Sequence, residues 1–219
     1  ANAYNENITI NNITVQDIAN RPIHVEYADG VIVSNFTVQR GADFAQYSRD
    51  SSVVNWPVCV NAIRCRNVLF EKFDIRECWG EGIAAGRGSE YVAISDGLVG
   101  ETFLGVYIHR CTNATVSNVG IYQKTPSVYK RGYGAIGLGI NNEIFATGFP
   151  EVNGVTINNV VGGNNGRNLA VMNQTSGSTY ENVQIGPDVL LAEAIRDVEE
   201  AALYLTASNA NNVNITVDV

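Results

Sequence analysis

The sequence is poor in charge, and its positive charge is scarcest. Only 16% of its 219 residues are Asp, Glu, Lys or Arg, below the usual quarter, and three lysines stand against eleven arginines. The net charge is −8 and no basic run reverses it locally, so we expect no nucleic-acid partner. No apolar stretch approaches the roughly 20 residues of a membrane-spanning helix, so we expect no membrane partner.

What is abundant instead is typical of strands and tight turns. Hydrophobic residues make up 45% of the chain, enough for a sizeable core, and Asn, Gly, Thr and Val take the place of the missing charged residues. Such a mixture favours many short strands joined by turns over long solvated helices.

A short phrase recurs along the whole chain. Residues 7 to 15 read NITINNITV and residues 153 to 161 read NGVTINNVV, with looser versions between. In each, an apolar–x–apolar strand, a polar residue and another short strand follow one another. Aligned on that polar residue, the copies fall 23, 37, 24, 22, 41, 23 and 36 residues apart, at Asn12, Asn35, Lys72, Asp96, Asn118, Asn159, Asn182 and Asp218.

A period of 22 to 24 residues, lengthened at intervals by an insertion, is typical of a solenoid. Each repeat holds three short strands with alternating apolar residues, which cannot bury their apolar face alone. Stacking the same strand of the next repeat ~4.8 Å away closes a continuous core. We therefore predict an all-β protein, with residues 1–219 forming one domain of seven to eight repeats, here called rungs.

The repeats read N-[VIT]-x-[IV]-x-[ND]-[VIF] with asparagine at one corner, which resembles the right-handed parallel β-helix of the pectate lyase-like superfamily. The resemblance covers nearly the whole chain. It implies that asparagines stack at a tight, left-handed corner and bond along the column. Both ends fall within a rung, so we expect further chain, a partner subunit or a cap.

Insertions in such a fold gather on one side and often form the binding side. The resemblance implies that the loops before the first strand of each rung wall a groove, and that this strand forms its floor. We expect the walls at 40–57, 123–134 and 186–201, the last containing a short helix over 188–200. The floor strands are predicted at 23–27, 58–63, 82–87, 105–110, 135–140, 169–174 and 202–207.

With aliphatic residues directed inward, the outward residues of the floor become candidates for a site. Counting back from the corners places Arg87 and His109 on adjacent rungs, ~5 Å apart in backbone, with Tyr107 on the strand of His109. An arginine could neutralise a uronate carboxylate while a histidine moves a proton, as β-elimination requires. The catalytic candidates are His109, Arg87 and Tyr107, and the substrate-binding candidates are Glu26, His24, Asn61, Tyr204 and Trp56. The alternative is that these are ordinary solvent-facing residues of a sheet.

Motifs of several related enzymes are missing. The N-T-D, D-D, G-H-G and R-I-K phrases of polygalacturonases and the Y-G-x-D-P-H-D phrase of alginate epimerases do not occur. The predicted floor holds only one acid, Glu26, unlike that of calcium-dependent pectate lyases, so we expect no metal and no cofactor. A glycosidase needs two carboxylates ~5–9.5 Å apart, which the loops could supply from Asp43, Asp50, Glu143, Glu151, Asp188, Glu193 and Asp197, with Asp50 and Asp197 preferred.

The four cysteines match no zinc-binding spacing. Cys65 and Cys111 share a column two rungs apart, ~9.6 Å by the strand spacing, beyond the ~7 Å that a disulfide allows. Cys59 and Cys65 flank one strand and point to different places. We interpret all four, Cys78 included, as free, buried, small apolar residues.

These features predict an extracellular or virion polysaccharide-binding β-helix that cleaves its glycan, as hydrolase or lyase. Phage tailspike depolymerases resemble it in their low charge, Asn and Gly content and acidity, which would make a trimer the expected homo-oligomer. The alternative is a non-catalytic structural or adhesive shaft.

Overall fold

The computed structural model describes residues 4–41, 57–122, 136–143, 148–163, 167–173, 177–191, 201–206 and 212–217. All regular elements in these ranges are strands. They are β1 (Asn5–Gln16), β2 (Ile23–Glu26), β3 (Ala28–Gln39), β4 (Val58–Ile63), β5 (Arg66–Gly86), β6 (Glu90–His109), β7 (Thr112–Tyr122), β8 (Ile136–Asn142), β9 (Asn153–Gly163), β10 (Arg167–Asn173), β11 (Thr179–Ile185), β12 (Leu190–Leu191), β13 (Ala201–Leu205) and β14 (Asn212–Val217).

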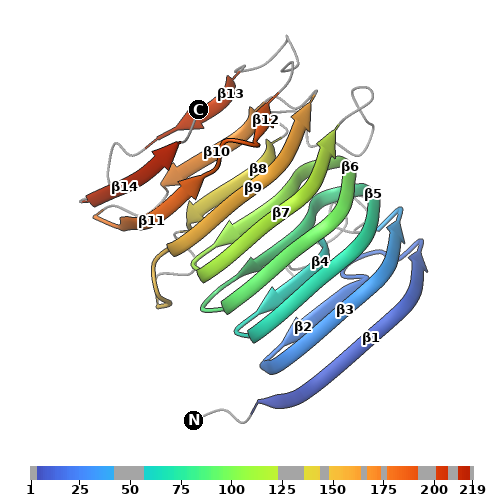
Figure 1. Ribbon diagram of the computed structural model, residues 1–219. Coiled ribbons are helices and arrows are strands. Elements are labelled where there is room, and N and C mark those ends of the chain that lie inside the picture. Colours follow the sequence, from blue (N-terminus) through green and yellow to red (C-terminus); the bar gives the residue numbers. More distant parts are fainter. Residues whose placement is uncertain are drawn as a thin grey trace.

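Every strand pair described is parallel, and the strands form two long stacks, with corners between the stacks and also inside the longer strands (Figure 1). One face has the order β1-β3-β5-β6-β7-β9-β11-β14. The other, the floor, runs through β2, β4, the ends of β5 and β6, then β8, β10 and β13. Parallel crossovers are right-handed in nearly all proteins, and the fold is the predicted right-handed parallel β-helix.

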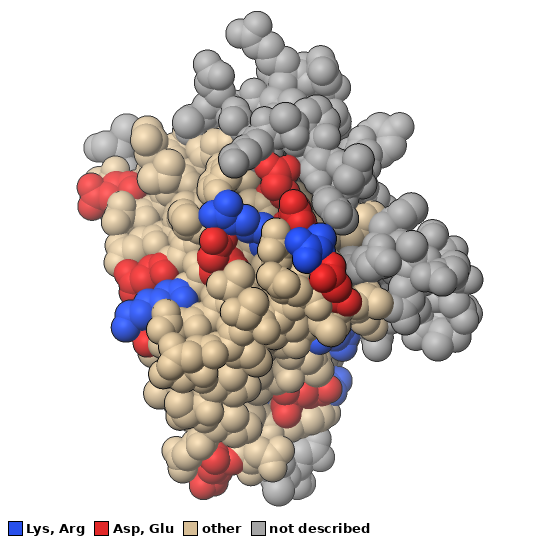
Figure 2. Space-filling view, turned by 90° about the vertical axis from the view of Figure 1, so that its right-hand side faces the viewer, with Lys and Arg blue, Asp and Glu red and all other residues tan. Residues whose placement is uncertain are grey.

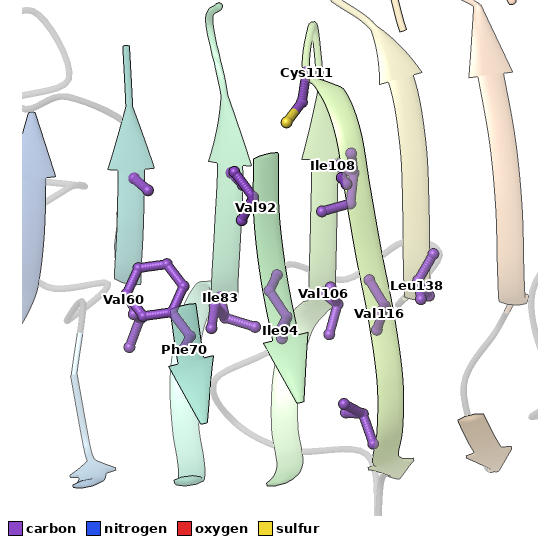
Figure 3. Close-up of a cluster of buried hydrophobic side chains, with 14 of the residues drawn as sticks. Val60, Phe70, Ile83, Val92, Ile94, Val106, Ile108, Cys111, Val116 and Leu138 are labelled. Atoms are coloured by element: carbon purple, nitrogen blue, oxygen red, sulfur yellow. The ribbon is translucent and has the colours of Figure 1, made fainter. Parts of the chain in front are cut away.

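The core is a column of aliphatic and aromatic side chains between the two faces. Figure 3 shows Val60, Ile83, Val106 and Leu138, which follow one another on successive floor strands, pointing toward side chains such as Ile94 of the opposite face. All five are fully buried. Alternation along each strand produces this arrangement, because every second side chain faces inward.

Corners form where residues adopt a left-handed backbone. The predicted polar column does so at Asn12, Asn35, Lys72, Asp96, Asn118 and Asn159, all with φ between 46° and 57°. The side-chain amide of Asn35 donates to Asn12 Oδ1 (2.7 Å), that of Asn118 to Asp96 Oδ1 (2.8 Å) and that of Asn159 to Asn118 Oδ1 (2.7 Å). Asparagine recurs because it tolerates this backbone and bonds along the column.

One member of the predicted column lies elsewhere. The pairing of Val183 with Val155 aligns Asn182 with Gly154, and its amide donates to Asn153 Oδ1 (3.0 Å). Asn182 therefore belongs to another left-handed corner, five residues earlier in each rung, which includes Asn7, Gly30, Asn67, Tyr91, Asn113 and Gly154. Asp218 lies outside the described residues.

Two further predictions were wrong. Leu190 and Leu191 form the strand β12 against Val161 and Gly162 rather than part of a helix, and residues 192–200 lie outside the described ranges. Cys59 and Cys78 form a disulfide with their Cα atoms 6.2 Å apart. The spacing argument tested only pairs within one strand or one column, whereas this bond joins the start of β4 to a residue near the corner inside β5. Cys65 and Cys111 are free and buried, as predicted.

Candidate functional site

The floor strands place their outward residues in two parallel columns. One runs His24, Asn61, Ala84, Tyr107, Gly139, Ala170, Tyr204. The other runs Glu26, Ile63, Gly86, His109, Asn141, Met172. All seven predicted floor strands are present, and Tyr107 and His109 lie side by side on β6.

This outward face is covered in its middle rather than open to solvent. Asn61 is 3% exposed, Tyr107 4% and His109 6%. Only toward β2 do His24 and Glu26 become exposed. The interpretation of the whole face as ordinary solvent-facing residues is therefore wrong for its centre, where polar side chains are held in a buried setting.

A histidine–carboxylate pair lies at the centre of the floor. His109 Nδ1 is 3.0 Å from Glu143 Oε2, and the two side chains are 7% and 19% exposed. The distance is that of a hydrogen bond, although the two atoms are not well aligned for one, and the contact becomes an ion pair when the imidazole takes up a proton. Glu143 comes directly after β8, which positions its carboxylate above the neighbouring strand β6.

The imidazole is held in a layered arrangement. The Tyr107 ring stacks on it with centroids 4.8 Å apart and planes 9° apart. On the preceding rung Gly86 faces it, and a Cβ at Gly86 would lie 2.2 Å from His109 Nε2. The missing side chain at residue 86 is therefore what gives the imidazole its position.

The pKa values of this cluster have identifiable causes. Burial alone raises the pKa of the Glu143 carboxyl, but the contact with His109 and the charge of Arg87 outweigh it, so that pKa lies below its usual value. Burial and the charge of Glu143 raise the pKa of Tyr107 well above the usual value, although its hydroxyl accepts a hydrogen bond from Asn141 Nδ2 (2.7 Å). Glu143 is therefore ionised at neutral pH, and Tyr107 keeps its proton.

Charged and amide groups surround a small hollow beside this pair. The hollow has a volume of about 40 Å³, little more than one water molecule occupies. Its polar lining consists of Arg21, Asn61, Glu81, Arg87, His109 and Glu143. Arg21 Nε, Arg87 Nε and Asn61 Oδ1 are buried without a hydrogen-bond partner among the described residues. These groups can bind a small polar or anionic group in the hollow.

The structure brings together some of the predicted site residues. Arg87 follows Gly86, which is the register partner of His109. The backbone N–H of Arg87 donates to the His109 carbonyl (3.1 Å), so Arg87 and His109 are adjacent, as the spacing predicted. Asn61 joins them at the hollow. Glu26 instead pairs with Arg64 (2.9 Å) and lies 3.4 Å from His24.

Other candidates lie elsewhere. Tyr204 is three strands from Tyr107 in its column, ~14 Å away by the strand spacing, and Arg167 packs over its ring at 3.8 Å. Trp56, Asp50 and Asp197 lie outside the described residues.

Sequence reasoning missed Glu81 and Arg21 and gave Glu143 only as one loop acid among seven. The predicted floor strand began at Gly82, but Glu81 already pairs with Val58 and Leu104 and so belongs to the floor. Residue 81 has the opposite parity to Ala84 and Gly86, and the register shifts between Cys78 and Glu81, so alternation could not have indicated Glu81. Arg21 lies before β2 and carried no periodic signal.

Within the described ranges, no three His, Cys, Asp or Glu side chains are grouped so as to hold a metal ion. The same residues include no helix long and apolar enough to cross a membrane.

No family model and no curated protein sequence matches this chain. Solved structures do. The surface protein and adhesin PfbA of Streptococcus pneumoniae superposes with a TM-score of 0.50 at 13% identity, over 98% of this chain and 66% of that one. An exopolygalacturonase from Thermotoga maritima superposes with a TM-score of 0.49 at 10% identity, over 97% of this chain and 53% of that one. The tailspike gp61 of Pseudomonas phage phi297 superposes with a TM-score of 0.48 at 15% identity, over 94% of this chain and 42% of that one.

These likenesses show the fold alone. The chain spans two-thirds or less of the length of each of these three structures.

Proposed function

We propose that this β-helix binds an acidic polysaccharide on its floor and cleaves it by β-elimination. The observation that carries the proposal is the buried His109–Glu143 pair beside two guanidinium groups, those of Arg21 and Arg87, whose Nε atoms have no partner among the described residues. A proton-transferring group next to donors for an anion is the combination that eliminative cleavage of a uronate requires.

The arginines bind and neutralise the uronate carboxylate. The hollow of about 40 Å³ has room for one such group but not for a sugar ring. The ring therefore lies outside it, with only its carboxylate directed toward Arg21 and Arg87. Neutralising the carboxylate makes the adjacent C–H more acidic, because the charge that develops on the carboxylate in the transition state is stabilised.

His109 moves the proton. In the elimination, a base takes the proton from the carbon next to the carboxylate, a carbon–carbon double bond forms, and the bond to the leaving glycosidic oxygen breaks. That oxygen then takes a proton from water, and the imidazolium later returns its own proton to solvent. With Nδ1 of His109 facing Glu143, Nε2 is the nitrogen left to accept the proton, and the ionised Glu143 stabilises the imidazolium. Tyr107 is not the base, because its pKa is raised; it holds the imidazole by stacking.

Hydrolysis is the second candidate, and one observation favours it. Glu81 and Glu143 line the same hollow, and a glycosidase needs two carboxylates facing one bond. In that mechanism Glu143, ionised at neutral pH, acts as the base or nucleophile and Glu81 as the acid.

The compartment and partners follow from the same proposal. A polysaccharide of this kind is met outside the cell or by a virion surface. The disulfide between Cys59 and Cys78 agrees with an oxidising compartment. On the face shown in Figure 2, basic (blue) and acidic (red) side chains lie in mixed groups, and uncharged surface separates these groups. A local anion site, and not a broad basic patch, would therefore select the glycan.

The test is incubation with a panel of polyuronates and neutral polysaccharides. Reducing ends and the ultraviolet absorbance of unsaturated uronates are then measured. Both signals on a polyuronate support the lyase. Reducing ends alone indicate hydrolysis and overturn the elimination. Neither signal on any substrate contradicts cleavage and leaves the non-catalytic shaft.

A further inference from the structure

A second and much larger hollow lies at the corner that follows the floor strands. Its volume is about 620 Å³, within the range of ligand-binding sites. The residues that matter in its wall are Tyr4, Tyr27, Arg64, Arg66, Arg87 and Phe149. The mechanism proposed above uses only Arg87 of these.

The backbone places a column of arginines along this corner, two of which, Arg64 and Arg87, line the hollow. Tyr27, Arg64, Arg87 and Arg110 all have a left-handed φ between 49° and 54°, and each ends a floor strand on a successive rung. Side chains at one corner of successive rungs project from backbones ~4.8 Å apart. Three guanidinium groups therefore follow one another along one corner, in a protein with only eleven arginines.

Planar groups line the hollow and are held in place. The Arg64 guanidinium lies 5.0 Å from the centroids of both the Tyr27 and Phe149 rings. It also donates to Tyr27 Oη (2.6 Å) and Glu26 Oε1 (2.9 Å). The Arg66 guanidinium lies 5.3 Å from the Tyr4 ring. Flat apolar faces with charged edges suit a sugar ring, which stacks by its C–H face and bonds by its rim.

We propose that this corner hollow is a subsite for a further anionic sugar of the same glycan, adjacent to the sugar that is cleaved. The inference rests on the proposed function of the floor. Arg87 carries the argument for continuity, because it lines both hollows. A glycan whose carboxylate reaches Arg87 from the floor therefore enters the corner hollow with its next residues.

The charges of the hollow indicate an anionic rather than a neutral sugar. Arg64 is paired with Glu26, and Arg66 lies 3.6 Å from Glu90 with its side chain 48% exposed. Arg87 Nε is buried without a partner among the described residues. The contact of Arg66 with Glu90 is longer than that of Arg64 with Glu26 (2.9 Å), so the exposed Arg66 guanidinium can meet a uronate or sulfate group of the next sugar.

The experiment compares oligosaccharides of two lengths. A uronate trisaccharide and a hexasaccharide, from whichever polyuronate the chain binds, are titrated by calorimetry into the full chain carrying His109→Ala, which prevents cleavage. Arg66→Gln is introduced into this background. Arg76→Gln is the matched control, because Arg76 also pairs with a carboxylate (Asp74, 2.6 Å), has its side chain 39% exposed, and lies further along β5, outside the lining of the corner hollow.

We expect Arg66→Gln to weaken binding of the hexasaccharide about 5- to 20-fold, the loss of one charge-assisted contact, and to leave the trisaccharide unaffected. Arg76→Gln should change neither. Equal affinity of Arg66→Gln and the background for the hexasaccharide would overturn the subsite, while cleavage by the wild type would still support the floor. A further outcome is that the wild type binds the hexasaccharide more tightly than the trisaccharide without cleaving either. If Arg66→Gln then removes that difference in affinity, the subsite is supported and only the catalytic proposal is overturned.

Discussion

Gly86 and His109 face each other on adjacent floor strands, and the imidazole occupies the space that a side chain at residue 86 would need. A Cβ there would lie 2.2 Å from His109 Nε2 and 2.4 Å from the His109 carbonyl oxygen. The position of the proposed base thus depends on a residue that does not touch the substrate.

Gly86→Ala should therefore displace His109 and lower cleavage, at a stability cost of about 1–3 kcal/mol for overpacking a buried site. Gly139→Ala is the control in the neighbouring column, where the nearest atoms are Cδ2 of the Tyr107 ring (3.2 Å) and the terminal methyl of Met172 (3.4 Å), so the overlap and its effect should be smaller. Turnover and urea denaturation measure both. Equal effects of the two substitutions would contradict this account of how His109 is positioned.

The cysteines allow a simple count. Of the four, Cys59 and Cys78 are bonded and Cys65 and Cys111 are free. Titration with a thiol reagent in denaturant should give two thiols without reductant and four after reduction. In the folded protein the reaction should be slow even at mildly alkaline pH, because burial raises the pKa of Cys111 to about 12. Four thiols in the unreduced, denatured protein would show that the disulfide is absent.

The corner column predicts a graded loss of stability. Asn118 donates to Asp96 and accepts from Asn159, with φ at 55°. Asn118→Gly removes the hydrogen bonds, each worth about 0.5–1.5 kcal/mol, but tolerates the backbone. Asn118→Ala should cost about 1 kcal/mol more, because alanine disfavours the left-handed region. Chemical denaturation ranks the three proteins, and an alanine variant as stable as the glycine variant would contradict the role of the backbone.

The His109–Glu143 pair predicts a pH dependence. The pKa of Glu143 is lower in the folded state than in the unfolded chain, so its contribution to stability is complete above the unfolded value and is lost as pH falls through the folded value. Glu143→Gln should cost about 1–2 kcal/mol at neutral pH, and the difference should disappear in acid. Denaturation of both proteins at several pH values measures it, and a difference that persists unchanged at low pH would exclude the charge as the cause.

The fold could be predicted because alternation and corner residues are local signals. The corner phrase can be aligned to either of two corners in each rung, however, because both favour asparagine. Asn113 and Asn118 occupy these two corners, five residues apart. In the rung of Asn182 the phrase matched the earlier corner, and the position five residues later is Pro187. The same phrase was therefore assigned to the wrong column.

The site was predictable only where the repeat extends into it. Spacing placed Arg87 beside His109 to within one residue, because Gly86 is the register partner of His109 and Arg87 follows Gly86. It left open whether the outward side chains form a site or simply face solvent, and His109 is 6% exposed. Contacts from outside the repeat, such as Glu143 beyond the end of β8 and Arg21 before β2, have no period and depend on where the connecting segments fold back.

The central claim is that the buried floor cluster performs the cleavage, and steady-state kinetics of His109→Ala on a polyuronate tests it most directly. A group that moves a proton acts mainly in the transition state, so kcat should fall about 100-fold or more with little change in KM. Arg87→Ala should raise KM, reflecting about 1.5–3 kcal/mol of lost binding, and should also lower kcat, because the guanidinium stabilises charge that develops in the transition state. Circular dichroism of each variant confirms that the β-helix is retained. Wild-type kcat in folded His109→Ala would contradict the account and move the chemistry away from the floor.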